Sequence, residues 1–324
     1  MRKKRFLFIL LAVLLLCPGC SAPVRPVSRT AAFFDTVITI RIYDKDAEDV
    51  LNSCLRKCTE YENRFSRTIE DSEIFRLNHA GGEPVELSPD TIALLRLGLK
   101  YSELSGGSFD ITIAPLSDLW DFKHNPGKCP DEAEILEARS HVNYRSLIIE
   151  DNTARLTDPS AAVDLGGIAK GYIADQLKAY MKSEGIRHAI IDLGGNVLAL
   201  GDKPDGTAFN IGIQKPFDET GTAITSVRLK DRSLVSSGIY QRYFKENGVL
   251  YHHILNPATG YPYENNLLGV TILCSSSAEA DALSTTCFAL GLEDGTAFIN
   301  SLPDTEALFI TDDYKLHPTS GFPQ

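Results

Sequence analysis

The segment Asp164–Asp175 places two adjacent glycines where the sequence changes from strand-like to helical. Residues 161–163 before it predict the end of a short buried strand, and apolar residues over 168–181 recur at helical spacing until Gly185 gives a stop signal. At such a junction, unpaired backbone N–H groups favour an anion, and the missing Cβ atoms let a ligand approach the backbone closely. The segment begins with the carboxylate of Asp164 and also contains Lys170. Together these two charges suit a phosphate-bearing ligand with a metal.

This segment matches neither G-x-x-x-x-G-K-[ST] nor G-x-G-x-x-G, so an ordinary glycine-rich turn is an equally good explanation of it alone. The next apolar run, His188–Leu193, predicts a second strand that ends in another Asp-Leu-Gly-Gly at 192–195. A strand, a helix and a strand in this order predict one crossover unit.

The remaining pattern predicts an α+β fold with mixed, largely antiparallel sheets and interspersed helices. The helices are expected over 46–65, 71–78, 88–105, 277–290 and 293–301. The strands are expected over 34–42, 108–116, 146–150, 153–157, 208–214, 223–229, 233–237, 249–254 and 268–274, with two more across 312–313.

The N-terminus predicts export from the cytoplasm. Residues 2–5 are basic and residues 6–16 are apolar, a run too short to span a membrane. The following Leu16-Cys17-Pro18-Gly19-Cys20 resembles a bacterial lipobox with Cys20 as the lipidated residue; a plain secretory peptide is the alternative. We therefore expect a lipoprotein signal peptide over 1–20, a flexible tether over 21–30 and one body over 31–324, lipid-anchored to a bacterial cell membrane on its periplasmic side or surface.

Net charge argues against nucleic acid as a partner. The chain of 324 residues carries a formal charge of −11, and removal of the basic leader would make it about −15. No low-complexity linker divides the body, whose length suffices for a large core.

Three further segments carry polar groups that a core does not need. Residues 236–242 form a turn with Arg242, which suits a phosphate or a carboxylate. The adjacent histidines at 252 and 253 point to opposite faces of a strand, so at most one enters a given site. Asp281 and Thr285 lie four apart on one helix face and offer oxygen ligands to a hard cation such as Mg²⁺. Each signal alone is weak, since a lone strand histidine is more often structural.

Taken in order, the segments resemble the ApbE family, the FAD:protein FMN transferases of bacterial cell envelopes. The resemblance runs from about Phe34 to Gly291. The blocks that carry it are Ser72-Glu73 through Leu77-Asn78, Phe109-Asp110-Ile111-Thr112 with Pro115-Leu116 and Trp120, Asp164 to Asp175, Ser237-Gly238-Ile239-Tyr240, His253-Ile254 with Asn256-Pro257-Ala258-Thr259-Gly260, and Ala280 to Thr285.

The resemblance implies that the protein binds FAD and Mg²⁺ and passes the FMN half of FAD to a threonine or serine hydroxyl of a target protein, releasing AMP. It implies redox pump subunits or extracytoplasmic flavoproteins as acceptors. The implied metal ligands are the carbonyl near Gly167, Asp281 and Thr285, with Ser284 alongside. His253 is the candidate for handling the proton of the acceptor or stabilising the phosphoryl group, and Asp281 is the alternative base. The implied FAD contacts are Phe34, Thr68, Ser108, Phe109, Asp110, Asp164, Lys170, Arg242 and Ile254.

Two departures from the family pattern concern the flavin ring. Phe34-Asp35 replaces a Met-Gly pair, and Thr68 stands where the family often has an aromatic residue. Tyr43 or Tyr101 is expected to compensate. Two other functions stay open: hydrolysis of FAD to FMN and AMP, and flavin binding without catalysis by an envelope lipoprotein.

Overall fold

The computed structural model describes residues 25–125 and 127–323. The predicted signal peptide with Cys20, and residues 21–24 of the predicted tether, lie outside this part. The tether prediction is wrong for 27–30, because these residues begin β1 (Val27–Phe33), which pairs antiparallel with β2 (Thr36–Ile42). The β1 sequence is polar and half-exposed, so its pattern does not predict a strand; β2 supplies the backbone partners that make it one.

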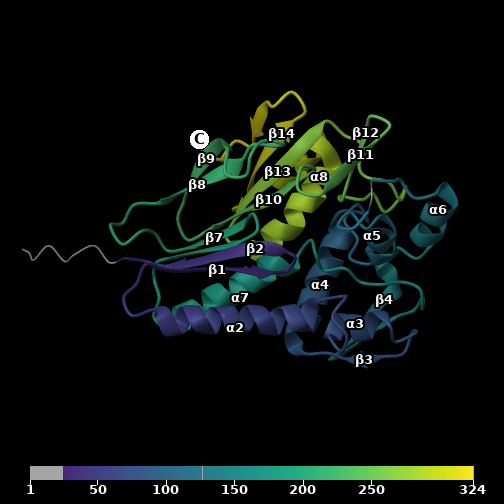
Figure 1. The fold of residues 1–324 in the computed structure, drawn as a ribbon, viewed down its shortest axis with the longest axis horizontal. Helices are drawn as coiled ribbons and strands as arrows, with labels where there is room; N and C mark the ends of the chain where they lie inside the picture. Colours follow the sequence, from purple (N-terminus) through teal and green to yellow (C-terminus); the bar gives the residue numbers. More distant parts are fainter. Residues whose placement is uncertain (1–24, 126, 324) are drawn as a thin grey trace, which may run out of the picture.

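An eight-stranded sheet organises the molecule (Figure 1). Every pairing between its neighbouring strands is antiparallel. Its strands follow the order β1, β2, β6 (Ala189–Leu193), β7 (Asn196–Leu200), β10 (Ser233–Gly238), β13 (Leu267–Cys274), β14 (Glu306–Thr311) and β15 (Leu316–Pro318). The predicted α+β class is thereby confirmed, whereas the predicted crossover unit is wrong, because β6 joins the sheet between antiparallel neighbours.

Three long helices cover one face of the sheet and bury the main core (Figure 1). They are α2 (Glu48–Phe65), α7 (Ala169–Ser183) and α8 (Ser277–Asn300). The backbone of α8 breaks at Gly291, where φ is 80°, so α8 consists of two helices joined at a kink, as predicted for 277–290 and 293–301. Its cap is Ser276, whose side chain accepts a hydrogen bond from the Glu279 N–H at 3.3 Å.

A separate antiparallel pair, β8 (Phe209–Gln214) and β9 (Ala223–Leu229), covers the opposite face and encloses a second core. Its inward side chains include Phe209 and Val227. The sheet is therefore buried on both faces, by helices on one side and by this hairpin on the other (Figure 1).

The remaining elements pack at one end of the sheet (Figure 1). They are α3 (Glu73–Asn78), β3 (Val85–Glu86), α4 (Pro89–Leu104), α5 (Ala114–Trp120), α6 (Glu132–Ser140), a 3-10 helix (Tyr144–Ser146), β4 (Leu147–Glu150), β5 (Thr153–Leu156), β11 (Tyr243–Glu246) and β12 (Val249–His252). The aromatic core around Trp120 joins α5, α6 and the β11–β12 hairpin.

The predicted strand over 108–116 is wrong. Within it only Ile113 makes a strand-like contact, an isolated parallel bridge to Ala162, and α5 begins at Ala114 with a proline in its first turn. The strand expected to end at 161–163 is reduced to the same bridge. Apolar runs this short do not distinguish a strand from a buried loop.

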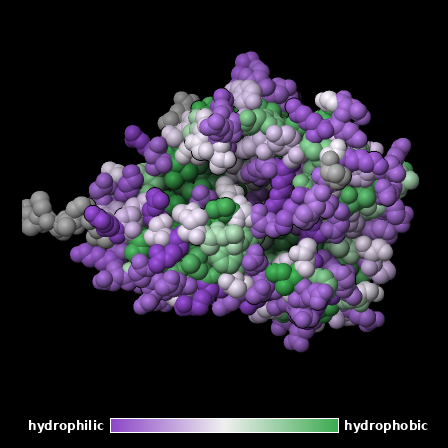
Figure 2. Space-filling view, viewed as in Figure 1, coloured by the Kyte–Doolittle hydropathy of each residue, from purple (hydrophilic) through white to green (hydrophobic). Residues whose placement is uncertain are grey.

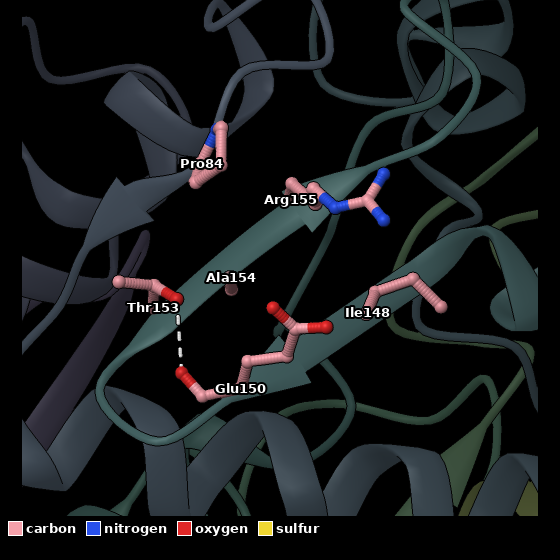
Figure 3. A pocket seen from close by; sticks show the side chains of 6 residues that line it. All are labelled: Pro84, Ile148, Glu150, Thr153, Ala154 and Arg155. Atoms are coloured by element: carbon pink, nitrogen blue, oxygen red, sulfur yellow. Dashed lines mark hydrogen bonds between the residues drawn. The ribbon is translucent and has the colours of Figure 1, made fainter.

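No helix in the described ranges is sufficiently long and apolar to span a bilayer. A small hollow of about 10 Å³ lies beside β4 and β5 and is lined by Pro84, Ile148 and Arg155 (Figure 3). That volume accommodates at most about one water molecule, so this hollow is not a site for a nucleotide.

Candidate active site

A single large cleft of about 1550 Å³ gathers the residues that the sequence predicted for the site. The space-filling view is hollowed near its centre, where polar and apolar surfaces meet (Figure 2). The predicted residues that line the cleft are Phe34, Thr68, Ser108, Phe109, Asp110, Asp164, Gly167, Lys170, Arg242, His253, Ile254, Asp281 and Thr285. Segments far apart in the chain therefore contribute to one cleft.

Asp281 lies where α7 and α8 touch. The residue is 4% exposed, and its Oδ2 accepts a hydrogen bond from the Gly171 N–H at 2.9 Å. The Lys170 ammonium lies 3.7 Å from the same oxygen. The close approach of α7 to the start of α8 requires glycine at position 171, because a Cβ there would lie 2.2 Å from the Ser277 carbonyl oxygen. The glycine thus brings a carboxylate and a lysine together in the cleft.

Three hydroxyls continue the site along α8. Ser237 on β10 lies 2.7 Å from the Ser284 hydroxyl and 3.2 Å from that of Thr285. Ser284 is fully buried, donates to the Asp281 carbonyl at 2.8 Å, and is not among the residues that line the cleft. The structure therefore places Ser284 behind the predicted metal ligands, where it supports Thr285 through Ser237.

The glycine-rich turn packs directly against these groups. A Cβ at Gly167 would lie 3.0 Å from the Phe109 ring and 3.8 Å from Thr285 Oγ1. Helix α7 begins at Ala169, after a turn in which Asp164 accepts a hydrogen bond from the Gly166 N–H at 2.8 Å. The backbone at 167 is thus adjacent to Thr285, although it is not the first residue of the helix.

These groups fit a magnesium ion. A carboxylate (Asp281), a hydroxyl (Thr285) and a backbone carbonyl (Gly167) are all hard oxygen donors, and one carboxylate leaves positions for water and phosphate oxygens, as Mg²⁺ requires. Among residues 25–125 and 127–323, no group of three or more His, Cys, Asp or Glu side chains suits a metal ion. The candidate site therefore relies on mixed oxygen donors.

The two adjacent histidines separate as predicted. His252 is buried, its Nε2 lies 3.0 Å from the Tyr263 carbonyl, and its Nδ1 accepts from the Ile254 N–H at 3.3 Å. His253 turns into the cleft, with Nδ1 at 3.3 Å from the Arg242 carbonyl. Loss of solvation lowers the pKa of His253 to about 3, and the charges of His252 and Arg242 act in the same direction. Its imidazole is therefore neutral at physiological pH.

Asp110 has a structural role in the cleft wall. Oδ1 accepts hydrogen bonds from the Thr112 N–H and hydroxyl at 2.7 and 2.6 Å, and Oδ2 accepts from the Tyr144 N–H at 2.9 Å. Burial raises its pKa although these bonds favour the ionised form. Its carboxylate is thus used within the protein, and it fixes the loop that presents Phe109.

The Phe34-Asp35 departure forms the turn between β1 and β2. Both residues have positive φ, 54° and 57°, as a two-residue hairpin turn requires. The Phe34 N–H donates to Glu62 at 2.7 Å, and Asp35 forms an ion pair with Lys123 at 2.5 Å. Lys123 lines the cleft and lowers the pKa of Asp35 through their hydrogen bond.

The expected aromatic compensation is wrong. Tyr43 packs against Phe209 in the second core, with ring centroids 5.4 Å apart, and Tyr101 is buried in the main core. Neither lines the cleft.

Sequence reasoning also missed Arg67. It lines the cleft, forms an ion pair with Asp118, and places its Nε 3.2 Å from Asp164 Oδ2. This arginine belongs to no recognisable motif, and its partners Asp118 and Asp164 lie in other segments of the chain.

A carboxylate, hydroxyls and a lysine beside a glycine-rich turn, within an α+β body, are the features of an enzyme that acts on a phosphate-bearing substrate. Comparison with known proteins identifies the family. Residues 34–309 match the ApbE family, and the chain belongs to it.

The relatives match over most of their length. A FAD:protein FMN transferase of Klebsiella pneumoniae (strain 342) is 33% identical over 290 residues, covering 89% of this chain and 90% of the relative. Another, of Treponema pallidum (strain Nichols), is 32% identical over 323 residues, covering 94% and 89%. The crystal structure of an ApbE protein from Thermotoga maritima has a TM-score of 0.85 at 28% identity over 93% of this chain and 100% of that one. The structure of the flavin transferase ApbE from Vibrio cholerae has a TM-score of 0.83 at 29% identity, over 93% of this chain and 99% of that one.

Proposed function

We propose that this protein is a Mg²⁺-dependent FAD:protein FMN transferase that modifies a threonine or serine hydroxyl and releases AMP. The observation that carries the proposal is the convergence of Asp281, Thr285 and the backbone at Gly167 in one cleft. The names of the relatives support the substrate and the kind of acceptor. The oxygen donors support Mg²⁺ at the FAD pyrophosphate.

In the proposed reaction, the acceptor hydroxyl oxygen forms a bond to the FMN phosphorus. The bond from that phosphorus to the bridging pyrophosphate oxygen breaks, AMP leaves with the electron pair, and the hydroxyl proton passes to a base. Mg²⁺, when bound, neutralises charge on the phosphoryl oxygens and on the leaving AMP.

His253 is the proposed base. If its Nδ1 carries the hydrogen and donates to the Arg242 carbonyl, Nε2 keeps a free lone pair at neutral pH. Asp281 is the alternative base, but its Oδ2 already accepts from Gly171. Lys170, beside the glycine-rich turn, is proposed to hold the phosphates, and Phe34, Phe109 and Ile254 to contact the rings.

The test is mass spectrometry of an acceptor domain that contains a candidate threonine, incubated with FAD and Mg²⁺. A mass gain of one FMN moiety, absent with EDTA, supports the transferase and its metal together. Free FMN and AMP without a mass gain would instead indicate FAD hydrolysis. Unchanged FAD with several acceptors would indicate a flavin-binding protein.

We also propose that a lipid on Cys20 holds the protein on the extracytoplasmic side of a bacterial membrane, where redox pump subunits or extracytoplasmic flavoproteins are its acceptors. The lipobox-like sequence at 16–20 supports this. Fractionation of cells that express wild type and Cys20→Ser tests it. Wild type is expected in the membrane fraction and the variant outside it; equal partitioning of both would contradict the anchor.

A further inference from the structure

The cleft extends beyond the helix-covered face of the sheet. Leu234 on β10 lies directly opposite Val197 on β7, which lies opposite Asp192 on β6. Residues directly opposite in antiparallel strands share one face. Leu234 packs in the second core under β8 and β9, whereas the next residue, Val235, packs in the main core under the helices. These three side chains therefore face the β8–β9 hairpin, away from Asp281.

We call this part of the cleft the hairpin lobe. Besides those three sheet residues it contains Ser236 and Gln241, and residues of β8 and the loop that follows it. The latter are Ile211, Gly212, Gln214, Phe217, Asp218, Thr220 and Gly221. Adjacent residues of β10 join the two sides, because Ser237 contacts Ser284 and Thr285 while Ser236 belongs to the lobe. The lobe thus opens directly beside the proposed phosphate site.

FAD and the metal do not account for this lobe. None of the residues assigned to them by family resemblance is in it. The whole cleft, about 1550 Å³, also exceeds the roughly 300–1,000 Å³ typical of a pocket for one small molecule. A second ligand therefore has room beside FAD.

The lobe has an apolar floor and an aromatic rim. Val197, Ile211 and Leu234 line the floor, with the Asp192 carboxylate beside them. At the rim, Phe217 packs edge-on against Tyr243 with ring centroids 5.1 Å apart. Phe217 is 41% exposed and has φ of 58°. A bulky side chain in this backbone conformation is an outlier, and such strain concentrates at functional sites.

We propose that the hairpin lobe binds an extended segment of the acceptor protein, with an apolar side chain next to the reactive threonine or serine seated on Val197, Ile211 and Leu234. The inference rests on the proposed transferase function. Successive side chains of an extended chain point to opposite sides. A segment whose apolar residue enters the lobe therefore directs the neighbouring hydroxyl towards Ser237 and the phosphate site, while the rim aromatics cover its backbone.

Two variants test the proposal. Ile211→Arg places a charge in the floor, and Phe217→Gly removes the rim ring while relieving its backbone strain, so the second variant is expected to fold even if the first does not. Asn210→Arg is the matched control, since this exposed residue lies on the other face of β8. We expect both lobe variants to raise the acceptor KM by roughly tenfold or more, as loss of a well-placed interface contact does. FAD affinity, measured by flavin fluorescence, is expected to stay at the wild-type value.

A second measurement separates this proposal from the transferase itself. An acceptor domain whose reactive residue is replaced by valine is titrated into the FAD-loaded protein in a calorimeter. Binding to wild type and to Asn210→Arg, but not to the lobe variants, supports the lobe even if no transfer is seen. Equal binding by all four proteins, no binding to wild type, or a parallel loss of FAD affinity in Phe217→Gly would overturn it. Absence of a mass gain with wild type would contradict only the transferase.

Discussion

At the residue scale, the carboxylate of Asp281 is held in place by its neighbours in the cleft. It is nearly buried, and the described neighbours of its Oδ2 are the Gly171 N–H and the Lys170 ammonium. We expect Asp281→Asn to reduce transfer at least about 100-fold, because loss of a group that merely orients a metal ligand typically costs roughly 10–100-fold. AMP release at increasing Mg²⁺ measures this, and partial recovery at high Mg²⁺ is expected. Glu279→Gln, two residues earlier and paired with Lys100 outside the cleft, is the control and should keep its activity.

His252 makes folding stability depend on pH. Burial lowers its pKa from 6.5 to about 4 in the folded protein. The unfolded chain therefore binds a proton as pH falls below about 6.5 while the folded chain does not, so stability is lost between these values by at most roughly 1.4 kcal/mol per pH unit. Asp110, Asp175 and Asp192 have raised pKa values and act in the opposite direction. Urea unfolding at pH 7 and 5 should show a smaller loss for His252→Gln than for wild type; an identical loss would contradict this assignment.

At the element scale, the contact between α7 and α8 depends on Gly171. A Cβ at this position would lie 2.2 Å from the Ser277 carbonyl oxygen, and backbone cannot move aside as a flexible side chain can. We expect Gly171→Ala to cost about 1–3 kcal/mol of unfolding free energy, as overpacking does. It should also reduce activity, because the N–H that orients Asp281 shifts. Ala179→Ser, on the exposed face of α7, is the control for unfolding and turnover. Wild-type stability in Gly171→Ala would show that the helices separate freely.

The elements that could be predicted from sequence are those with a complete local signal. Helix α4 has Ser88 as its cap and proline at its first position, and the 293–301 helix follows Gly291. The strand β1 and the helix α5 could not be predicted. The residues of β1 become a strand through pairing with β2, and α5 is positioned by the core around Trp120. The pairing of β1 is with its neighbour along the chain, whereas α5 depends on contacts made only after distant segments have met.

At the scale of the whole molecule, the same distinction applies to the cleft. Asp281, Thr285 and the glycine-rich turn belong to segments with recognisable patterns, and tertiary packing brings them together. Arg67, Lys123 and Phe217 carry no pattern of their own. Their positions follow from an ion pair across the cleft or a turn at its rim. Resemblance to a family identifies the catalytic side of such a site better than the side that meets a variable partner.

Because segments from 34 to 285 converge on this cleft, ligand binding should stabilise the whole fold. A ligand that binds the folded state alone adds about 2.7 kcal/mol at a hundredfold excess over its Kd. If FAD and Mg²⁺ share the site, the Tm increase produced by FAD should be larger with Mg²⁺ than with EDTA. In Asp281→Asn the increment due to Mg²⁺ should disappear, while the increase due to FAD alone remains. Differential scanning calorimetry of both proteins measures this. A Tm increase independent of Mg²⁺ in wild type would separate the flavin site from the metal site and contradict their proposed arrangement around one pyrophosphate.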